Sequence, residues 1–215
     1  MKGRVSFVSA RQEQIMYQKK APCTIGLVVI NIAVFFFLAF QGMTEDAVFM
    51  VDHGAMYVPY IVELGEYYRM ITSMFMHFDL NHLMNNMITL GALGWQLELE
   101  VGKIKYLLIY FLSGIAGNML SMLQEIHANE YAVSVGASGA IFGIIGALLY
   151  IAIRNHGRIR NVSGKGILFM VVLTLYHGYT NMGVNNMAHI GGLIMGFAAG
   201  ILLYRKRRKS TLSEA

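Results

Sequence analysis

The run VSVGASGAIFGIIGALLYIAI, residues 133–153, decides the fold class because it contains no charged side chain. A helix needs about 20 apolar residues to cross the roughly 30 Å hydrocarbon layer of a bilayer. The run therefore predicts a membrane-spanning helix over Val133–Ile153. Within it, glycines flank the hydroxyl side chain of Ser138, which makes this residue a candidate for helix packing or for chemistry.

The rest of the chain is similarly apolar, with 56% hydrophobic and 13% charged residues over a length of 215. Soluble domains carry about 25% charged residues, so the bilayer is the expected solvent. The sequence has no alternating apolar and polar segments of the kind that build a membrane barrel, so we expect an all-α bundle. The six predicted spans are Cys23–Gln41, Asn81–Leu97, Tyr106–Leu123, Val133–Ile153, Lys165–Thr180 and Asn186–Tyr204.

The charges predict how the six spans are oriented. Of the 17 Lys and Arg residues, only Arg69 falls on the side of the membrane that also holds most of the acidic residues. The positive-inside rule therefore puts both termini in the cytoplasm. We divide the chain into a cytoplasmic tail over residues 1–22, a six-helix core over 23–204 and a basic cytoplasmic tail over 205–215.

The segment Gly42–Met76 joins the first two spans on the outer side. It is too long for a tight turn and contains four tyrosines, and tyrosine favours the headgroup layer. We expect a structured loop that lies partly in the outer leaflet.

Four polar residues fall in the outer halves of the second, fourth and sixth spans, which all begin at the outer face. They are His82, Asn86, Ser138 and His189. Buried polar groups in a bilayer are costly, so they mark candidate sites. An imidazole can remove the proton of a serine hydroxyl, and the resulting alkoxide can attack a carbonyl.

The proposed chemistry also needs a site for the oxyanion. His82 and Asn86 are four residues apart and share one helical face, so both can assist the amide of Ser138. The predicted spans have no acidic residue at this depth, which favours a Ser-His dyad over a triad. Gly139/Gly143, Gly192/Gly196 and Gly196/Gly200 allow the fourth and sixth spans to approach closely.

Each residue also has a purely structural interpretation. Ser138 can be a packing notch, His189 a hydrogen-bonded interior histidine, and Asn86 a contact between helices. His177 is the strongest rival base. A soluble hydrolase nucleophile elbow is excluded because Ala140 stands where that motif has glycine, and no strand precedes the serine.

Other site classes find no support in the sequence. The single Cys23 cannot form an internal disulfide, and no Cys and His residues have the spacing of a structural zinc site. We expect no metal and no cofactor. The basic residues lie in loops and tails, which argues against nucleic acid as a partner and is consistent with contacts to membrane lipids.

Several ordered motifs resemble the rhomboid intramembrane serine proteases, over roughly Gly42 to Gly200. Gly-Glu-Tyr-Tyr-Arg at residues 65–69 is similar to the family's Gly-Glu-x-Trp-Arg, and Phe-Met-His follows at residues 75–77. The later spans carry His-x-x-x-Asn at residues 82–86, Gly-x-Ser-Gly at 136–139 and Ala-His-x-x-Gly at 188–192.

The resemblance implies a role for each matching residue. Ser138 would be the nucleophile and His189 the general base, with His82, Asn86 and the Ser138 amide forming the oxyanion hole. Support would come from five further residues: Gly136, Gly139, Phe142, Arg69 and Glu66. The sequence departs from the family pattern at Tyr68, where Trp is usual, and at Phe142, where some members have a Tyr that stacks on the histidine. Phe can also stack, so we expect activity to be kept.

The resemblance further implies transmembrane proteins as substrates, cut near their spanning segments. A six-helix form resembles bacterial members, which implies a multi-pass protein of the plasma membrane with its active site open to the extracytoplasmic side. The alternatives are an inactive relative that binds transmembrane segments and a small transporter, although no acidic or proline-broken span favours the latter. The sequence leaves the oligomeric state open.

Overall fold

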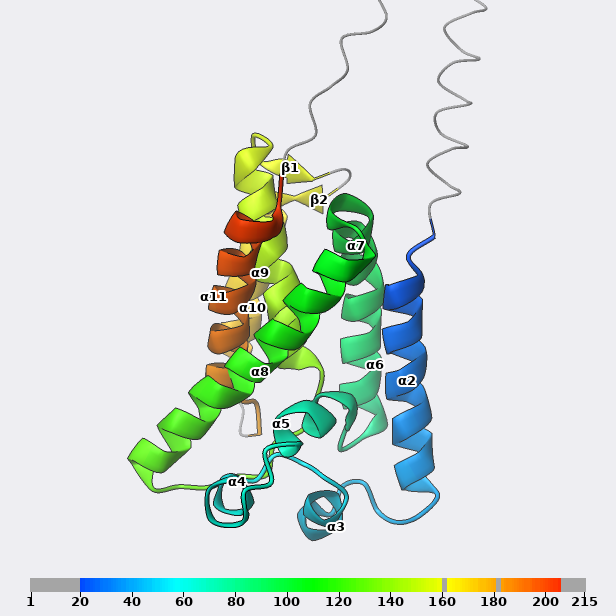
Figure 1. Cartoon of the computed structure of the whole chain (residues 1–215), viewed down its shortest axis with the longest axis vertical. Coiled ribbons are helices and arrows are strands. Elements are labelled where there is room, and N and C mark those ends of the chain that lie inside the picture. The colour runs from blue at the N-terminus through cyan, green and yellow to red at the C-terminus, as the bar shows by residue number, and fades with distance from the viewer. Residues whose placement is uncertain (1–19, 160–161, 181–182, 206–215) are drawn as a thin grey trace, which may run out of the picture.

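The computed structural model describes residues 20–159, 162–180 and 183–205, and these form a bundle of helices (Figure 1). Most of the two predicted tails, 1–22 and 205–215, lies outside the described residues. The elements, in chain order, are α2 (Pro22–Ala39), α3 (Ala47–Asp52), α4 (Val58–Leu64), α5 (Arg69–Thr72), η1 (Ser73–Phe75), α6 (Leu80–Thr89), η2 (Leu90–Gly94), α7 (Trp95–Val101), α8 (Lys103–Ala128), α9 (Ser138–Arg154), β1 (Arg158–Ile159), β2 (Val162–Ser163), α10 (Gly164–Thr180) and α11 (Asn186–Leu203).

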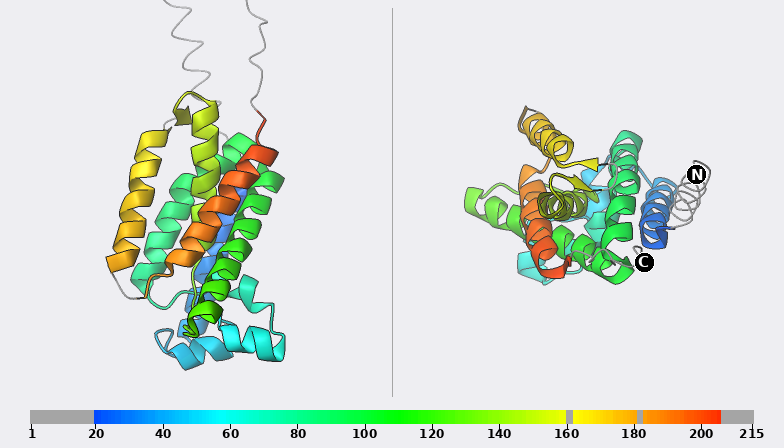
Figure 2. Two further views of the ribbon diagram at one scale, coloured as in Figure 1. Left: turned by 90° about the vertical axis from the view of Figure 1, so that its left-hand side faces the viewer. Right: turned by 90° about the horizontal axis from the view of Figure 1, so that it is seen from above.

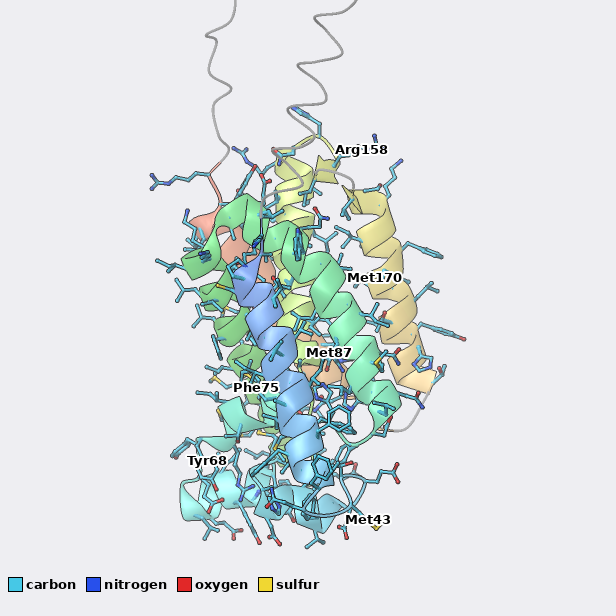
Figure 3. All side chains as sticks on the ribbon, turned by 90° about the vertical axis from the view of Figure 1, so that its right-hand side faces the viewer. Met43, Tyr68, Phe75, Met87, Arg158 and Met170 are labelled. Carbon is cyan, nitrogen blue, oxygen red and sulfur yellow. The ribbon has the colours of Figure 1, made fainter. Side chains whose placement is uncertain are left out.

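The long helices alternate in direction. α6, α9 and α11 run from the end that holds α3, α4 and α5 towards the end that holds β1 and β2, while α2, α8 and α10 run the other way (Figure 1). Figure 3 shows Arg158 at one end of the bundle and Tyr68 and Met43 at the other. The expected common direction of the second, fourth and sixth spans is therefore confirmed.

Within the part of the chain that the structure describes, three helices are long and apolar enough to cross a membrane: α2, α8 and α11. α9 is a shorter apolar helix. Large apolar side chains face outward along these helices, as in α2, where Phe36 and Phe37 are 48% and 65% exposed. Exposed apolar surface of this kind is expected where lipid covers the protein. The count of six spans stays a prediction.

The predicted start of the fourth span is wrong. The helix begins at Ser138 and not at Val133, because Ser134 in the preceding segment bonds to another part of the chain. Ser134 pairs with Met56 in an antiparallel bridge, and Gly136 has a φ of +126°, a conformation that glycine adopts without strain. The expectation of a purely helical chain also needs correction, because β1 and β2 form a two-residue antiparallel hairpin with Arg158 opposite Ser163.

α9 lies in the centre of the bundle, seen end-on in Figure 2. It packs against α11 with almost no side chains between the two backbones. A Cβ added to Gly192 would strike the carbonyl of Gly139, and one added to Gly196 would strike the backbone of Gly143. The close approach that the glycine spacings predict is confirmed, and it brings the beginnings of α9 and α11 together.

The second predicted span is continuous but irregular. α6 passes through one π-helical turn, η2, into α7 and ends at Val101, beyond the predicted Leu97. Near that end the buried Glu98 accepts hydrogen bonds from the backbone nitrogens of Cys23 and Thr24 at 3.0 and 2.7 Å. N–H groups in the first turn of a helix have no acceptor within the helix, so the carboxylate of Glu98 caps the start of α2.

The segment between α2 and α6 is structured, as predicted, and contains α3, α4 and α5. Arg69, only 3% exposed, holds it together. Its Nη1 donates to the carbonyl oxygens of Val51 and Ala55 at 2.6 and 2.9 Å, and its Nε donates to Glu66 at 2.6 Å. Arg69 and Glu66 therefore provide structural support. The depth of this segment in lipid stays a prediction.

Candidate active site

Ser138 is the first residue of α9 and faces the start of α11. Its Oγ lies 3.0 Å from Nε2 of His189, which is the fourth residue of α11. The predicted pair is therefore within hydrogen-bonding distance. The rest of α9 and α11 holds the two residues there through the glycine contacts between the helix backbones.

The ring of His189 is 5% exposed and stacks on Phe142, with centroids 4.2 Å apart and planes 6° from parallel. The stacking expected at Phe142 is confirmed. Among the described residues, Nδ1 of His189 has no hydrogen-bond partner, so no carboxylate of this part of the chain holds the ring. The stack on Phe142 orients the imidazole where a triad would use an acid.

His82 lies close to the segment that leads into Ser138, here called the serine loop (residues 134–137). It lies in the first turn of α6, where Asp79 accepts a hydrogen bond from its backbone nitrogen at 2.8 Å. A Cβ on Gly136 would lie 2.8 Å from Nε2 of His82, so the imidazole sits against the glycine two residues before Ser138. Gly136 is thus required both for its positive φ and for the space it leaves.

Asn86 is buried beside His82, with 6% exposure. Its Nδ2 donates to the carbonyl oxygen of His82 at 2.9 Å, within α6. The amide nitrogen would have to leave this bond to contact an oxyanion at Ser138. The backbone of Gly139 packs directly against α11, because a Cβ added to Gly192 would strike its carbonyl oxygen. A Cβ on Gly139 itself would only make van der Waals contact, 3.4 Å from the carbonyl oxygen of Ala188.

His77 is a buried residue of this site to which the sequence analysis gave no role. It lies in the loop before α6, and its ring meets that of His82 edge-on, with centroids 5.0 Å apart. Both ring nitrogens are buried, and the backbone of Phe75 lies close to the ring. Burial, with a smaller effect from His82, lowers the pKa of His77 to about 3, so this ring is neutral at physiological pH.

A cavity of about 20 Å³ lies beside Ser138. Its polar lining includes Ser73, Asn118, Ser134 and Asn185. Asn118 is fixed by donating to the carbonyl oxygen of Met70 at 2.8 Å and to Oγ of Ser73 at 3.1 Å. A polar cavity of this size holds about one water molecule.

Asn118 and Asn185 were also missed by the sequence analysis. The signal for Asn185 was present, because asparagine just before an apolar helix is a common N-cap. His77 belongs to the Phe-Met-His motif at residues 75–77, but the motif alone gave it no role. No comparable pattern marked Asn118, whose partners Met70 and Ser73 are distant in sequence. Within the described residues, no three His, Cys, Asp or Glu side chains are grouped as metal ligands.

The Rhomboid domain model matches residues 64–206, which include all the residues of the site. The chain is similar to Rhomboid protease GluP of Bacillus subtilis (strain 168), with 33% identity over 194 residues, 90% of this chain and 37% of GluP.

Two further relatives are similar to this chain. YdcA of the same organism, provisionally named a rhomboid protease, is 34% identical over 145 residues, 67% of this chain and 71% of YdcA. RHOMBOID-like protein 5 of Arabidopsis thaliana is 38% identical over 145 residues, 66% of this chain and 46% of that protein. The chain thus spans less than half the length of GluP and of RHOMBOID-like protein 5.

Proposed function

This chain belongs to the rhomboid family, and we propose that it is an intramembrane serine endopeptidase with Ser138 as nucleophile and His189 as general base. The observation that carries the proposal is the 3.0 Å contact between Ser138 Oγ and His189 Nε2. A serine hydroxyl is a weak nucleophile until a base takes its proton, and this contact supplies the base. The protease names of GluP and, provisionally, YdcA support the reaction class.

In the proposed reaction, Oγ of Ser138 attacks the carbonyl carbon of the scissile peptide while His189 Nε2 takes the hydroxyl proton. The carbonyl oxygen becomes an oxyanion, which the amide of Ser138 and the side chain of His82 stabilise. Asn86 joins them if its Nδ2 leaves the carbonyl of His82. His189 then gives its proton to the leaving amine nitrogen, which leaves an acyl group on Ser138.

Water must then release the acyl group. The cavity beside Ser138 is sized for one water molecule and lined by hydroxyl and amide groups that can hold it. The water attacks the ester carbon while His189 takes one of its protons. The bond between that carbon and Oγ of Ser138 then breaks, and His189 returns the proton to Oγ. No metal or cofactor is needed for this sequence of steps.

The family and the apolar helices make the chain an integral membrane protein. We propose that it resides in a bacterial plasma membrane with cytoplasmic termini, an active site open to the extracytoplasmic side, and transmembrane proteins as substrates. The described Lys and Arg residues other than Arg69 lie towards the end of the bundle that holds β1 and β2, which supports this orientation. Substrates would reach Ser138 laterally, and α10, at the edge of the bundle, is the helix we expect to move (Figure 2).

The test is cleavage of a single-span model substrate by purified protein in liposomes. Ser138→Ala and His189→Ala should each abolish cleavage without unfolding the protein. Ser113→Ala is the matched control, because Ser113 is also buried but lies on α8 with no hydrogen-bond partner among the described residues, and it should keep activity. His177→Ala tests the rival base and should also keep activity.

A fluorophosphonate probe identifies the nucleophile independently of any substrate. Mass spectrometry should find the adduct on Ser138. An adduct on another serine, or cleavage by the Ser138→Ala variant, would contradict the assignment. A folded wild-type protein that neither cleaves nor is labelled would favour the alternative of an inactive relative that binds transmembrane segments.

A further inference from the structure

One side chain outside the Ser138–His189 pair is hydrogen-bonded both to α11, which carries His189, and to the segment that leads into α9, which begins with Ser138. Asn185 precedes α11, and its Oδ1 accepts a hydrogen bond from the backbone nitrogen of Ala188 at 2.9 Å. Its Nδ2 donates to Oγ of Ser134 at 3.1 Å and to Oγ of Ser121 at 2.6 Å. The amide thus links α8, α11 and the extended segment before α9.

The hydrogen bond between Asn185 and the backbone of Ala188 affects the position of His189, the proposed base. Ala188 immediately precedes His189, and the backbone carbonyl of Asn185 itself accepts from the backbone nitrogen of His189 at 3.3 Å. Asn185 therefore fixes the backbone of the first turn of α11, which includes His189. Side-chain caps of this kind fix the backbone of the first helical turn.

The bond to Ser134 acts on the nucleophile. Ser134 lies four residues before Ser138, in the extended segment that pairs with Met56. The backbone of this segment, the serine loop, leads directly into Ser138 through Gly136. The side chain of Asn185 therefore joins the serine loop to the start of α11.

The bond to Ser121 fixes which way the amide of Asn185 points. Ser121 donates its hydroxyl proton to Oε1 of Glu125 at 3.0 Å, so its oxygen is left to accept from Asn185. Glu125 is 5% exposed, and its Oε2 accepts from the backbone nitrogen of Ala132, in the same segment as Ser134. If the amide of Asn185 were flipped, Nδ2 would face the N–H of Ala188, so only one orientation satisfies every group.

We propose that Asn185 is a positioning residue for the Ser138–His189 pair, held in its orientation by Ser121 and Glu125. This inference rests on the proposed protease function. The side-chain hydrogen bonds of Asn185 go to Ser121, Ser134 and Ala188, and not to Oγ of Ser138 or the imidazole of His189, so it acts through the backbones that carry them. Errors of about 1 Å between reacting groups can cost about 100-fold in rate, which is the scale on which such a residue acts.

Two substitutions separate the cap from the bridge. Asn185→Ala removes all three side-chain bonds. Asn185→Asp keeps an oxygen for the N–H of Ala188, because Asp and Asn cap helices about equally well, but it cannot donate to Ser121 or Ser134. Asn186→Ala is the matched control, because the neighbouring Asn186 donates instead to the carbonyl of Leu175 on α10, at 3.2 Å.

The experiment measures the rate of fluorophosphonate labelling of Ser138, together with kcat and KM for a single-span substrate in liposomes and the thermal midpoint of each variant. We expect Asn185→Ala to label at least about 10-fold more slowly, with the loss in kcat and not in KM. Asn185→Asp should show a similar loss in rate, although the oxygen that caps α11 is kept. Asn186→Ala should label within about 2-fold of wild type.

Two outcomes would overturn the inference. Wild-type labelling rates in both Asn185 variants would remove the positioning role, and a wild-type rate in Asn185→Asp alone would show that capping suffices and that the donated bonds do not position the pair. Should Asn185→Ala fail to fold, Asn185→Asp still decides the question. Failure of folded wild-type protein to label is a separate result, which rejects the proposed function itself.

Discussion

Gly192→Ala is the perturbation that most directly tests the packing beneath the site. Gly192 lies one turn beyond His189, against Gly139, the neighbour of Ser138. An added Cβ would stand 2.8 Å from the carbonyl carbon and 3.3 Å from Cα of Gly139, and closer still to its oxygen. Carbon atoms prefer separations of about 3.5–4.0 Å, so the helices would have to part by about 1 Å.

That displacement falls on the reacting pair. Adding about 1 Å to the 3.0 Å contact between Ser138 and His189 would take it beyond hydrogen bonding. We expect labelling of Ser138 by a fluorophosphonate to slow by about 100-fold. Overpacking should also destabilise the fold by about 1–3 kcal/mol, measured as a lower thermal midpoint in detergent.

Two further glycine variants act as controls. Gly196→Ala would clash with the backbone of Gly143 in the same way but lies two turns beyond His189, so it should destabilise the fold with a smaller effect on labelling. Gly26→Ala, in α2, has open space around the added Cβ and should stabilise the helix by about 0.5–1 kcal/mol. Wild-type labelling and stability in Gly192→Ala would refute the close α9–α11 packing.

Three other predictions concern Arg69, Phe142 and His77. Arg69→Ala leaves two buried carbonyls without their donor and should destabilise the fold by about 2 kcal/mol or more, seen as faster proteolysis between α2 and α6. Phe142→Leu removes the stack worth about 1 kcal/mol and should slow labelling about 5-fold, whereas Phe142→Tyr should not. His77 stays neutral in the folded protein, whereas the unfolded chain binds a proton below a pKa of about 6.5. The free energy of unfolding should therefore be complete above pH 6.5 and about 1.4 kcal/mol lower at pH 5.5, measured as a pH series of thermal midpoints. His77→Gln should lower that slope, and an unchanged slope would show that His77 does not cause it.

The sequence was informative wherever a pattern is local. Apolar runs predicted the long helices to within a few residues, and the glycine spacings predicted the contact between α9 and α11, because small residues four apart form one smooth helical face. The pairing of Ser138 with His189 followed from helix direction and depth. The apolar runs and the glycine faces depend on neighbours within one or two helical turns, and the alternation of the spans across the membrane supplied the rest.

Features set by partners far along the chain were missed or misjudged. The start of α9 depends on the bridge between Ser134 and Met56, which no pattern in residues 133–153 shows. The amide of Asn86 was predicted to face the oxyanion, but its orientation depends on competition with the carbonyl of His82. Asn118 and Asn185 gain their significance only from hydrogen bonds to other elements.

The error at the start of α9 bears on the proposed chemistry. In a helix beginning at Val133, the amide of Ser138 would donate to the carbonyl of Ser134, four residues earlier, and would be unable to bind an oxyanion. In the structure that carbonyl instead accepts from the backbone nitrogen of Met56 at 3.0 Å. Ser138 becomes the first residue of α9, where N–H groups lack helical acceptors and the helix dipole favours negative charge. The bridge to Met56 therefore frees the amide that the proposed mechanism requires, and it ties the segment between α2 and α6 to the reactivity of Ser138.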